Sequence, residues 1–303
     1  MKEERVIRIG TRESRLAMWQ AEYVARQIRT SHPEIKVELV PMTTTGDKIL
    51  HRALDQVGGK GLFVKELDLA LREKCTDLSV HSLKDVPMEI PEDLPLLAFT
   101  GREDPRDAVI FRDRNLKEET GSKLRIGTSS SRRRIHLQEL YPNADFPLIR
   151  GNVQTRLQKV ESGEYDGTVL AMAGLKRLGL EDRADRILEP DEMLPAAGQG
   201  ILAIQGRAGE DYSFLEEIDD EDSRAEALAE RAFIKVLQGG CSAPSAAYAK
   251  MDAKTQTLWL RGMYCPQEGM PYLKGERKGT PDQAEAIGKA LAESLKERYT
   301  EGD

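Results

Sequence analysis

The pattern Arg-Ile-Gly-Thr-x-x-Ser-Arg occurs twice in the 303-residue chain, at residues 8–15 and again at residues 125–132. Each copy comes after a short aliphatic run and precedes a segment with helical periodicity. The pattern therefore predicts a strand, a Gly-Thr turn and the first turn of a helix. A helix N-terminus presents free N–H groups and a partial positive charge, which together bind anions. Two such ends predict two similar lobes that face a shared cleft for an acidic small molecule.

A single Gly-Thr turn is more often a plain helix cap than a ligand site. Whether the two turns belong to a ligand site therefore depends on whether the segments after each copy also repeat. After the first copy we expect helices at 14–29 and 63–73 and strands at 37–42 and 78–82. After the second copy we expect helices at 132–140 and 153–161 and strands at 147–150 and 167–171. An aspartate, Asp77 or Asp166, precedes the last strand of each series. Alternating strands and helices predict parallel sheets with helices on both faces, and thus two doubly wound α/β lobes.

The periodicity changes in the last third of the chain. Ser223-Arg-Ala-Glu226 has the form of a capping box. The apolar residues behind it fall on one helical stripe, which Gly239-Gly240 ends. This stripe consists of Ala225, Leu228, Ala229, Ala232, Phe233, Val236 and Leu237. Alternation at 255–260 and a helical pattern at 281–298 complete a predicted small α+β domain.

Composition excludes several classes of protein. The formal net charge of −7 argues against a general nucleic-acid binder. No apolar run reaches membrane-spanning length, and the first residues lack the apolar core of a secretory signal. Three widely spaced cysteines offer neither a disulfide framework nor a zinc pattern. We therefore expect a soluble, cytoplasmic protein without a metal site.

Arginines gather at the second copy of the repeat, where Ser131-Arg-Arg-Arg134 stands. Such a run is usually a solvated helix face, and it could also bind phosphate. Because this run begins at a helix end already predicted to bind anions, we favour carboxylate recognition by forked guanidinium contacts.

Cys241 lies in a Gly-Gly-Cys-x-x-Pro loop after the long helix of the last domain. A lone cysteine is most often a small buried hydrophobe. The negative end of the preceding helix would disfavour a thiolate, whereas reactive thiolates favour helix N-termini and cationic neighbours. The position therefore suits a permanent covalent attachment better than a nucleophile that turns over.

Two further segments of the first lobe are candidates for the cleft. The glycine-rich loop at 43–61 is long for a compact domain and predicts a lid or binding segment, with a disordered surface excursion as the alternative. Lys84 and Asp85 come after a predicted strand and precede Pro87, at the strand end where ligands collect. Adjacent opposite charges are ordinarily solvated. In a cleft lined with arginines, however, the carboxylate would be a salt-bridge partner or the group that meets developing positive charge.

Nine motifs occur in order along nearly the whole chain. They are Gly46-Asp47, Gly58-Gly-Lys-Gly-Leu-Phe63, His81-Ser-Leu-Lys-Asp-Val-Pro87, Arg102-Glu-Asp-Pro-Arg-Asp107, Gly127-Thr-Ser-Ser130, Leu148-Ile-Arg-Gly-Asn152, Ala173-Gly-Leu-Lys-Arg-Leu-Gly179, Ala197-Gly-Gln-Gly200 and Gly239-Gly-Cys241. Taken together they resemble the hydroxymethylbilane synthase family, also called the porphobilinogen deaminase family. No single motif would be specific, but their number and order are.

The resemblance implies an enzyme with two lobes like those of a periplasmic binding protein and a small α+β C-terminal domain. The implied boundaries are 1–100 with 200–218 for the first domain, 101–199 for the second and 219–303 for the third. Members of the family join four porphobilinogen molecules head to tail, with loss of ammonia, to form the linear tetrapyrrole hydroxymethylbilane. The primer is a dipyrromethane cofactor, which the residue matching Cys241 would hold through a thioether. Neither metal nor nucleotide is implied, and we expect a monomer.

The resemblance also implies roles for individual residues. Asp85 matches the catalytic carboxylate, which would help to expel the amine and stabilise the methylene-pyrrolenine cation. Cofactor-binding positions match Cys241, Lys84, Ser14, Thr128, Ser130, Arg132, Arg133 and Arg150. Substrate-binding positions match Arg12, Arg156, Arg177, Gln199 and Phe63.

Ser131 and Ser245 depart from the family pattern, in which more apolar residues are usual, and we expect them to affect local packing alone. Two other classes of function are alternatives. A two-lobed binding protein for an acidic ligand would keep the repeat and the cleft but would not need Cys241 or Asp85. A nucleic-acid-binding protein would use the arginine run on phosphates and bind with steep salt dependence.

Overall fold

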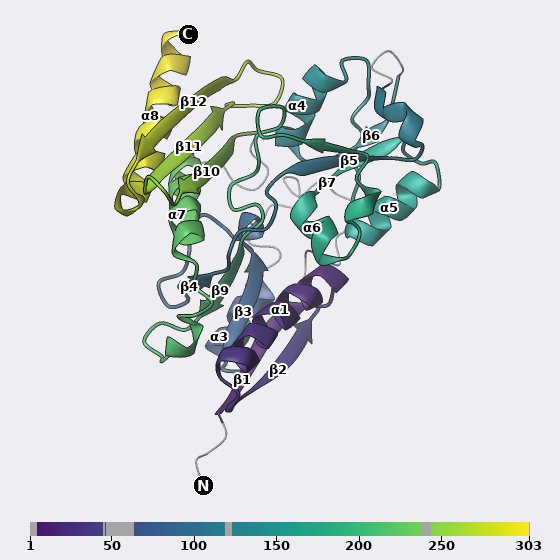
Figure 1. Ribbon diagram of the computed structural model, residues 1–303. Helices are drawn as coiled ribbons and strands as arrows, with labels where there is room; N and C mark the ends of the chain where they lie inside the picture. The colour runs from purple at the N-terminus through teal and green to yellow at the C-terminus, as the bar shows by residue number, and fades with distance from the viewer. Residues whose placement is uncertain (1–4, 45, 47–63, 119–122, 238–243, 303) are drawn as a thin grey trace.

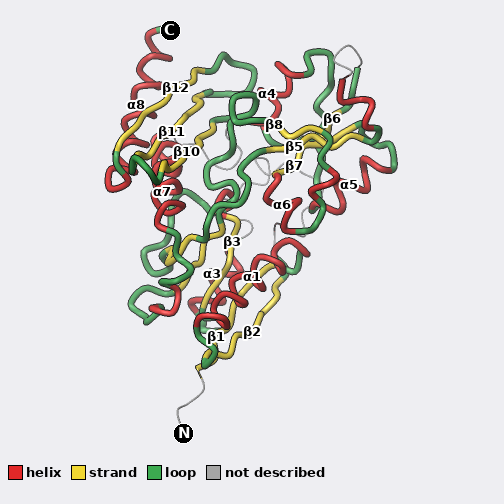
Figure 2. The backbone as a smooth tube through the Cα atoms, in the orientation of Figure 1, coloured by secondary structure: helices red, strands yellow, loops and turns green. Residues whose placement is uncertain are grey.

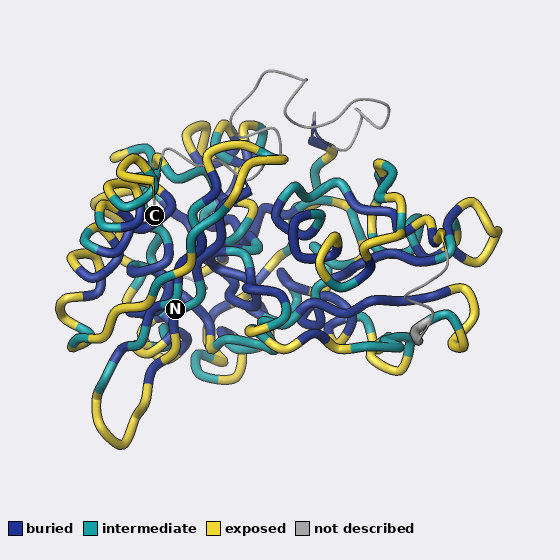
Figure 3. Tube along the Cα trace, turned by 90° about the horizontal axis from the view of Figure 1, so that it is seen from above, coloured by how far each residue is buried: buried dark blue, intermediate teal, exposed yellow. Residues whose placement is uncertain are grey.

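The computed structural model describes residues 5–44, 46, 64–118, 123–237 and 244–302. Its strands form three separate sheets, and each sheet is accompanied by its own helices (Figure 1). Viewed from above, the buried stretches run through the interior and exposed segments lie mostly at turns around the rim (Figure 3). No helix in the described ranges combines the length and the apolar composition that crossing a membrane requires.

The first lobe is a five-stranded sheet in the order β2-β1-β3-β9-β4. Its strands are β1 (Arg5–Arg12), β2 (Ile35–Met42), β3 (Leu78–Ser82), β4 (Leu96–Phe99) and β9 (Leu202–Gly206). Helix α1 (Arg15–Ser31) covers one face, where its buried Val24 and Ile28 join the cluster that contains Ile7 and Ile9 of β1. Helix α3 (Lys65–Arg72) covers the other face, because a Cβ built on Gly10 would meet the side chain of Leu67 at 3.3 Å. The lobe is therefore doubly wound.

The second lobe is a four-stranded sheet in the order β6-β7-β5-β8. Its strands are β5 (Asp107–Phe111), β6 (Ile126–Gly127), β7 (Gly167–Ala171) and β8 (Arg186–Leu188). Helix α4 (Ser131–Leu140) packs on one face through Leu137, while α5 (Val153–Glu161) and α6 (Met172–Arg177) pack on the other through Leu157 and Leu175. This lobe is also doubly wound, as the repeat predicts.

The repeat extends to the aspartates that precede the last predicted strand of each series. In the first lobe the backbone N–H of Arg8 donates to Oδ2 of Asp77 at 2.8 Å. In the second lobe the backbone N–H of Arg125 donates to Oδ2 of Asp166 at 2.9 Å. Each aspartate also donates its own backbone N–H to the carbonyl oxygen of that arginine. The positional match between the two lobes is therefore confirmed at the level of hydrogen bonds.

Two details of the predicted sheets were wrong. Neither sheet is wholly parallel, because β9 runs antiparallel to β3 and β4, and β5 runs antiparallel to β7 and β8. Both strands enter their sheet from the other lobe, and a local strand–helix alternation cannot indicate their direction. The predicted strand at 147–150 is absent from this described stretch of chain. A single bridge between Arg125 and Asp145 and a hydrogen bond from Thr128 N–H to the Pro147 carbonyl take its place.

The chain crosses between the lobes twice, through residues 100–106 and 189–201, largely in loop conformation (Figure 2). The two crossings touch at Gly200, whose φ is +94°. A Cβ at this position would lie 2.2 Å from the carbonyl oxygen of Glu103. Only glycine therefore allows the two crossing segments to approach this closely.

The third part is an antiparallel sheet of β10 (Ala246–Asp252), β11 (Thr257–Tyr264) and β12 (Leu273–Gly279). Helices α7 (Glu221–Val236) and α8 (Ala284–Glu301) pack on one face through Phe233 and Leu291, which gives the predicted α+β arrangement. The predicted capping box was wrong, because the residue that caps α7 is Asp220, which accepts from Ser223 N–H at 2.7 Å. Ser223 is buried instead, and its hydroxyl accepts the backbone N–H of Arg102.

Candidate active site

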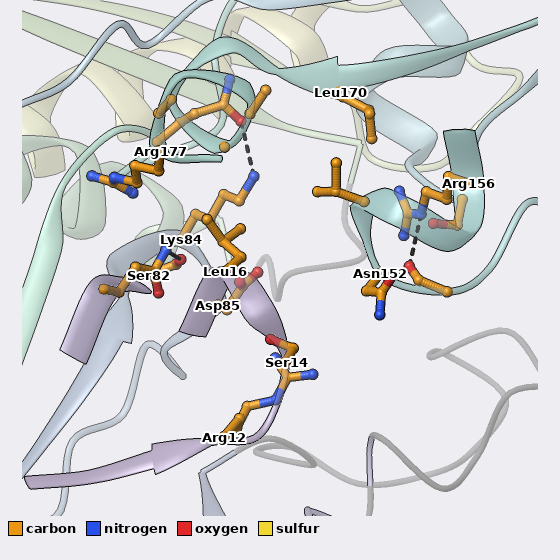
Figure 4. A pocket seen from close by; sticks show the side chains of 18 of the residues that line it. Arg12, Ser14, Leu16, Ser82, Lys84, Asp85, Asn152, Arg156, Leu170 and Arg177 are labelled. Carbon is orange, nitrogen blue, oxygen red and sulfur yellow. Dashed lines mark hydrogen bonds between the residues drawn. The ribbon is translucent and has the colours of Figure 1, made fainter. Parts of the chain in front are cut away.

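A cavity of about 700 Å³ lies between the two lobes. The first lobe contributes Arg12, Ser14, Lys84 and Asp85, and the second contributes Arg133, Arg150, Arg156 and Arg177; Gln199 comes from the second crossing segment. Arg12, Ser14 and Asp85 lie on one side of the cavity, and Asn152 and Arg156 lie on the other (Figure 4). Most of the residues implied by the sequence therefore meet at one place.

Three helices begin beside this cavity, which is lined by Ser14 and Asn152, the caps of α1 and α5, and by Ser129, the residue before the cap of α4. The Ser14 hydroxyl caps α1 by accepting Ala17 N–H at 3.3 Å, and the Ser130 hydroxyl caps α4 by accepting Arg133 N–H at 3.4 Å. The Asn152 side chain caps α5 by accepting Thr155 N–H at 2.9 Å. Since each end carries partial positive charge, the three together favour a polyanionic ligand.

The second copy of the repeat is shifted by one residue at the start of its helix. Ser131 matches Ser14 in the pattern, yet Ser131 is already the first residue of α4, and Ser130 is the cap. Thr128 is buried and accepts the backbone N–H of Ser130 through its hydroxyl at 3.2 Å. Thr128 and Ser130 therefore shape the turn, while the neighbouring Ser129 lines the cavity.

Lys84 and Asp85 lie on a 3₁₀ turn, Leu83–Asp85, directly after β3. The Asp85 side chain is exposed to the cavity, and Lys84 Nζ donates to Gln199 Oε1 at 3.3 Å. Burial lowers the pKa of Lys84 to about 8; Asp85 and Asp107 oppose this shift, whereas Arg133 and Arg132 add to it. An ammonium and a carboxylate therefore stand side by side where a ligand can reach them.

Arg132 and Arg133 have different surroundings. The guanidinium of Arg132 is buried away from the cavity and donates to the Leu194 carbonyl at 2.6 Å and to Asp107 Oδ2 at 2.7 Å. Arg133 lines the cavity and donates to the Val169 carbonyl and to Asp107 Oδ1. Burial alone would raise the pKa of Asp107, but the two arginines hold it well below its usual value. Asp107 is therefore a carboxylate anion on which both arginines are fixed.

The remaining arginines form a wall with excess positive charge. Arg156 Nε donates to the Gly151 carbonyl at 2.9 Å, and one guanidinium N–H of Arg177 donates to the Gly200 carbonyl at 2.6 Å. Burial, with the nearby cations Arg133 and Arg150 adding to it, lowers the pKa of Arg156 to about 10. Burial also lowers the pKa of Arg177 to about 10. Such shifts indicate cations that are withdrawn from water, and anionic ligand groups would stabilise them.

Apolar side chains complete the cavity. Leu16 from α1 and Leu170 from β7 both line it, together with Ala171 and Ala173. Figure 4 shows Leu16 on the side of the cavity where Asp85 lies and Leu170 on the side where Arg156 lies. The cavity therefore combines carboxylate-binding groups with surfaces against which a flat ring can pack.

Several predicted site residues lie outside the described residues. These are Phe63, Cys241 and, from the predicted loop 43–61, residue 45 and residues 47–61. From that loop region Gly46 is described, and it lines the cavity.

Other cavity residues were not among the predicted ones. Glu13, Asn152 and Lys159 line the cavity, and Asp107 lies behind it. Asn152 had a visible signal, since asparagine before a helical pattern is a favoured cap. Asp107 ends one of the nine motifs, but no local pattern predicts its contact with α4, because a carboxylate at the start of a strand becomes a partner of that helix only after the second lobe has folded.

Comparison with known proteins gave consistent matches. Residues 7–214 match the family model described as porphobilinogen deaminase, dipyrromethane cofactor binding domain, and residues 224–297 match that of the porphobilinogen deaminase C-terminal domain. A porphobilinogen deaminase of Acetivibrio thermocellus is 49% identical over 94% of this chain and 96% of its own length. That of Alkaliphilus oremlandii is 48% identical over 96% of each chain. Among solved structures, the periplasmic aliphatic sulphonate binding protein SsuA of Escherichia coli aligns with a TM-score of 0.41 and 14% identity, over 77% of this chain and 70% of that chain.

Proposed function

Since the chain belongs to the porphobilinogen deaminase family, we propose that it deaminates four porphobilinogen molecules and joins them head to tail into hydroxymethylbilane. This reaction makes it a transferase of tetrapyrrole biosynthesis that uses a dipyrromethane cofactor. The observation that carries the proposal is the cavity itself, where an exposed carboxylate lies among helix N-termini and buried arginines. Each pyrrole of the substrate carries two carboxylates, so the excess positive charge matches the ligand.

The residues present fit a dipyrromethane. The buried Nε of Arg133 has no hydrogen-bond partner in the described part of the chain, and an oxygen of a ligand carboxylate would satisfy it. We propose that Ser14, Lys84, Arg133 and Arg150 hold its carboxylates and that Cys241 holds it covalently. Once bound, the group supplies the nucleophilic pyrrole carbon to which the substrate is joined.

The second set of groups would hold the incoming substrate. Arg12, Arg156 and Arg177 would bind its acetate and propionate groups, with Gln199 beside them and Phe63 from the loop. Asp85 would hold the proton that the departing amine takes up, and its carboxylate would then face the positive charge that remains on the substrate. Lys84, fixed by Gln199, keeps an ammonium next to that carboxylate.

The proposal also covers the domain boundaries, the oligomeric state and the cellular location of the protein. We assign residues 1–100 with 200–218, 101–199 and 219–303 to three domains, which is supported by the position of β9 in the first sheet. We further propose that the protein acts as a monomer and in the cytoplasm. Porphobilinogen is its proposed small-molecule partner.

The test combines intact mass with product formation. Purified protein incubated with porphobilinogen should form hydroxymethylbilane, and a peptide map should show two linked pyrroles on the peptide that contains Cys241. C241S should carry no pyrrole and be largely inactive. C75S, which replaces an exposed cysteine that does not line the cavity, should retain both adduct and activity. An unmodified, inactive wild-type protein after this incubation would refute the proposal.

A further inference from the structure

We propose that Asp107 is a positioning residue for the reaction, which fixes Arg133 directly and holds Lys84 beside Asp85 through Gln199. The inference rests on the proposed function and deepens it, because it assigns the arrangement of the 3₁₀ turn Leu83–Asp85 to a residue outside the cavity. Asp107 is the first residue of β5 and is fully buried. The first crossing segment ends immediately before it, so its backbone lies at the junction of the two lobes.

The carboxylate of Asp107 joins three side chains. Its Oδ2 accepts from Arg132 at 2.7 Å, and its Oδ1 accepts from Arg133 at 2.7 Å and from Gln199 Nε2 at 3.1 Å. Arg132 and Arg133 come from α4, and Gln199 comes from the second crossing segment. One buried anion therefore connects the arginine-bearing helix with the segment that returns to the first lobe.

These contacts also fix the orientation of the Gln199 amide. Its Nε2 donates to Asp107 and to the Pro105 carbonyl, the latter at 2.6 Å. An inverted amide would direct its oxygen at these two acceptors, so the oxygen must point the other way. It accepts from Lys84 Nζ there. Asp107 and the Pro105 carbonyl thus determine that the oxygen of the Gln199 amide, and not its nitrogen, faces Lys84.

The balance of charge gives this link a functional consequence. The charged groups that act on Lys84 are Asp85 on its own turn, Arg132 and Arg133 on α4, and Asp107 on β5. Asp107 supports the ammonium form, whereas the two arginines oppose it. Neutralising Asp107 would leave three cations facing Asp85 alone. Lys84 would then lose its proton at a lower pH.

The experiment compares the pH dependence of turnover in wild type and D107N. The loaded state of each protein is first checked by intact mass. In wild type we expect the rate to fall at alkaline pH as Lys84, with a pKa of about 8, loses its proton. In D107N we expect this alkaline midpoint to lie about one pH unit lower, so that activity at pH 8 is roughly fivefold lower than in wild type and recovers on acidification.

The matched control is D104N, which removes a carboxylate three residues earlier. Asp104 pairs with Arg106 and is not among the groups that act on Lys84. Its alkaline midpoint should equal that of wild type. A purely structural role for Asp107 would lower the rate of D107N equally at every pH, and that result would overturn the inference.

Q199L keeps the inference testable if D107N does not fold. This variant removes the acceptor from Lys84 but leaves the contacts of Asp107 with both arginines. Its alkaline midpoint should move in the same direction as that of D107N, and an unchanged midpoint would refute the link. Wild type serves as the reference for the proposed function: if wild type itself does not convert porphobilinogen, the proposed function fails, independently of how the variants behave.

Discussion

At the scale of single residues, the 3₁₀ turn Leu83–Asp85 places two neighbouring charged side chains in different surroundings. Asp85 is exposed to the cavity, whereas Lys84 is partly buried and hydrogen-bonded to Gln199. The short 3₁₀ turn after β3 sends these adjacent side chains into different surroundings. A carboxylate that must exchange protons with a ligand has to be accessible, and a cation that orients ligand carboxylates gains from being fixed.

The first prediction concerns Asp85. D85A should fold and keep its affinity for pyrrole carboxylates but lose about 10²- to 10⁴-fold in turnover, because no other group is proposed to supply its proton. The rate of porphobilinogen consumption measures the effect, and thermal unfolding checks the fold. D93A, which removes an exposed carboxylate paired with Arg72, is the control and should turn over normally. Normal product formation by D85A would contradict the assigned role.

At the scale of elements, α4 has a second role besides its N-terminus. His136 of α4 is fully buried, its ring lies 6.2 Å from that of Tyr272, and neither ring nitrogen has a hydrogen-bond partner among the described side chains and backbone. The same helix contacts the third part through ion pairing of Arg134 with Glu268 and a hydrogen bond from Tyr272 to Glu139. Helix α4 thus links the arginine-bearing lobe to the third part.

The second prediction concerns the surroundings of His136. Burial, with Arg132 and Lys274 adding to it, lowers the pKa of His136 to about 3, below its usual value of 6.5. The folded state therefore binds this proton less readily than the unfolded chain, and stability should be complete above pH 6.5 and fall as the pH decreases towards 3. Between pH 6.5 and 5 the loss from this group should be about 2 kcal/mol.

Urea unfolding of wild type and H136F at these two pH values measures that loss. H136F keeps a ring against Tyr272 but cannot be protonated. Between the two pH values its free energy of unfolding should therefore fall by about 2 kcal/mol less than that of wild type. H32F is the control, since His32 lies far along the chain on the first lobe and is partly exposed. Equal pH dependence in wild type and H136F would contradict the prediction.

The third prediction concerns the crossing of α7 and α8. A Cβ added at Gly288 would lie 2.3 Å from the Ala229 carbonyl oxygen, so the two helices would have to separate. We expect G288A to destabilise the protein by about 1–3 kcal/mol through overpacking. At Gly101 the nearest atom to a new Cβ is 3.7 Å away, and G101A should be nearly neutral. Thermal unfolding of both variants measures the difference. Equal stability of G288A and G101A would contradict the prediction and show that α7 and α8 can separate at no cost in stability.

At the scale of the whole molecule, Arg102 joins the crossing segments to the third part. Its guanidinium donates to Glu226 and Glu230 of α7, both at 2.7 Å, and to the Gln199 carbonyl. Glu230 in turn accepts the backbone N–H of Gly198. The position of the residue that holds Lys84 therefore depends on a buried ion cluster between the crossing segments and α7.

The fourth prediction tests this cluster. R102M should destabilise the protein by about 3–5 kcal/mol, because it leaves two buried carboxylates without their cation. K176M removes the exposed pair of Lys176 with Glu103, which joins the same segment to α6, and should change stability by less than about 1 kcal/mol. Thermal unfolding compares the two variants. A small effect of R102M would mean that Glu226 and Glu230 are stable in this interior without the arginine.

Local patterns in the chain were enough to predict the doubly wound lobes, the α+β third part, and the presence of two helix ends and of Lys84 and Asp85 at one cavity. Caps, aliphatic runs and residues at the ends of strands act within a few positions along the chain, so they can be read without the fold. The antiparallel direction of β5 and β9, the bridge in place of the 147–150 strand and the separation of Arg132 from the cavity emerged only in three dimensions. Each of these depends on a partner far away in the chain: β5 and β9 enter from the opposite lobe, and Arg132 is held by Asp107 and Leu194. Pairing of this kind is set by how the lobes pack, because a buried charge must meet its counter-charge wherever the fold places it.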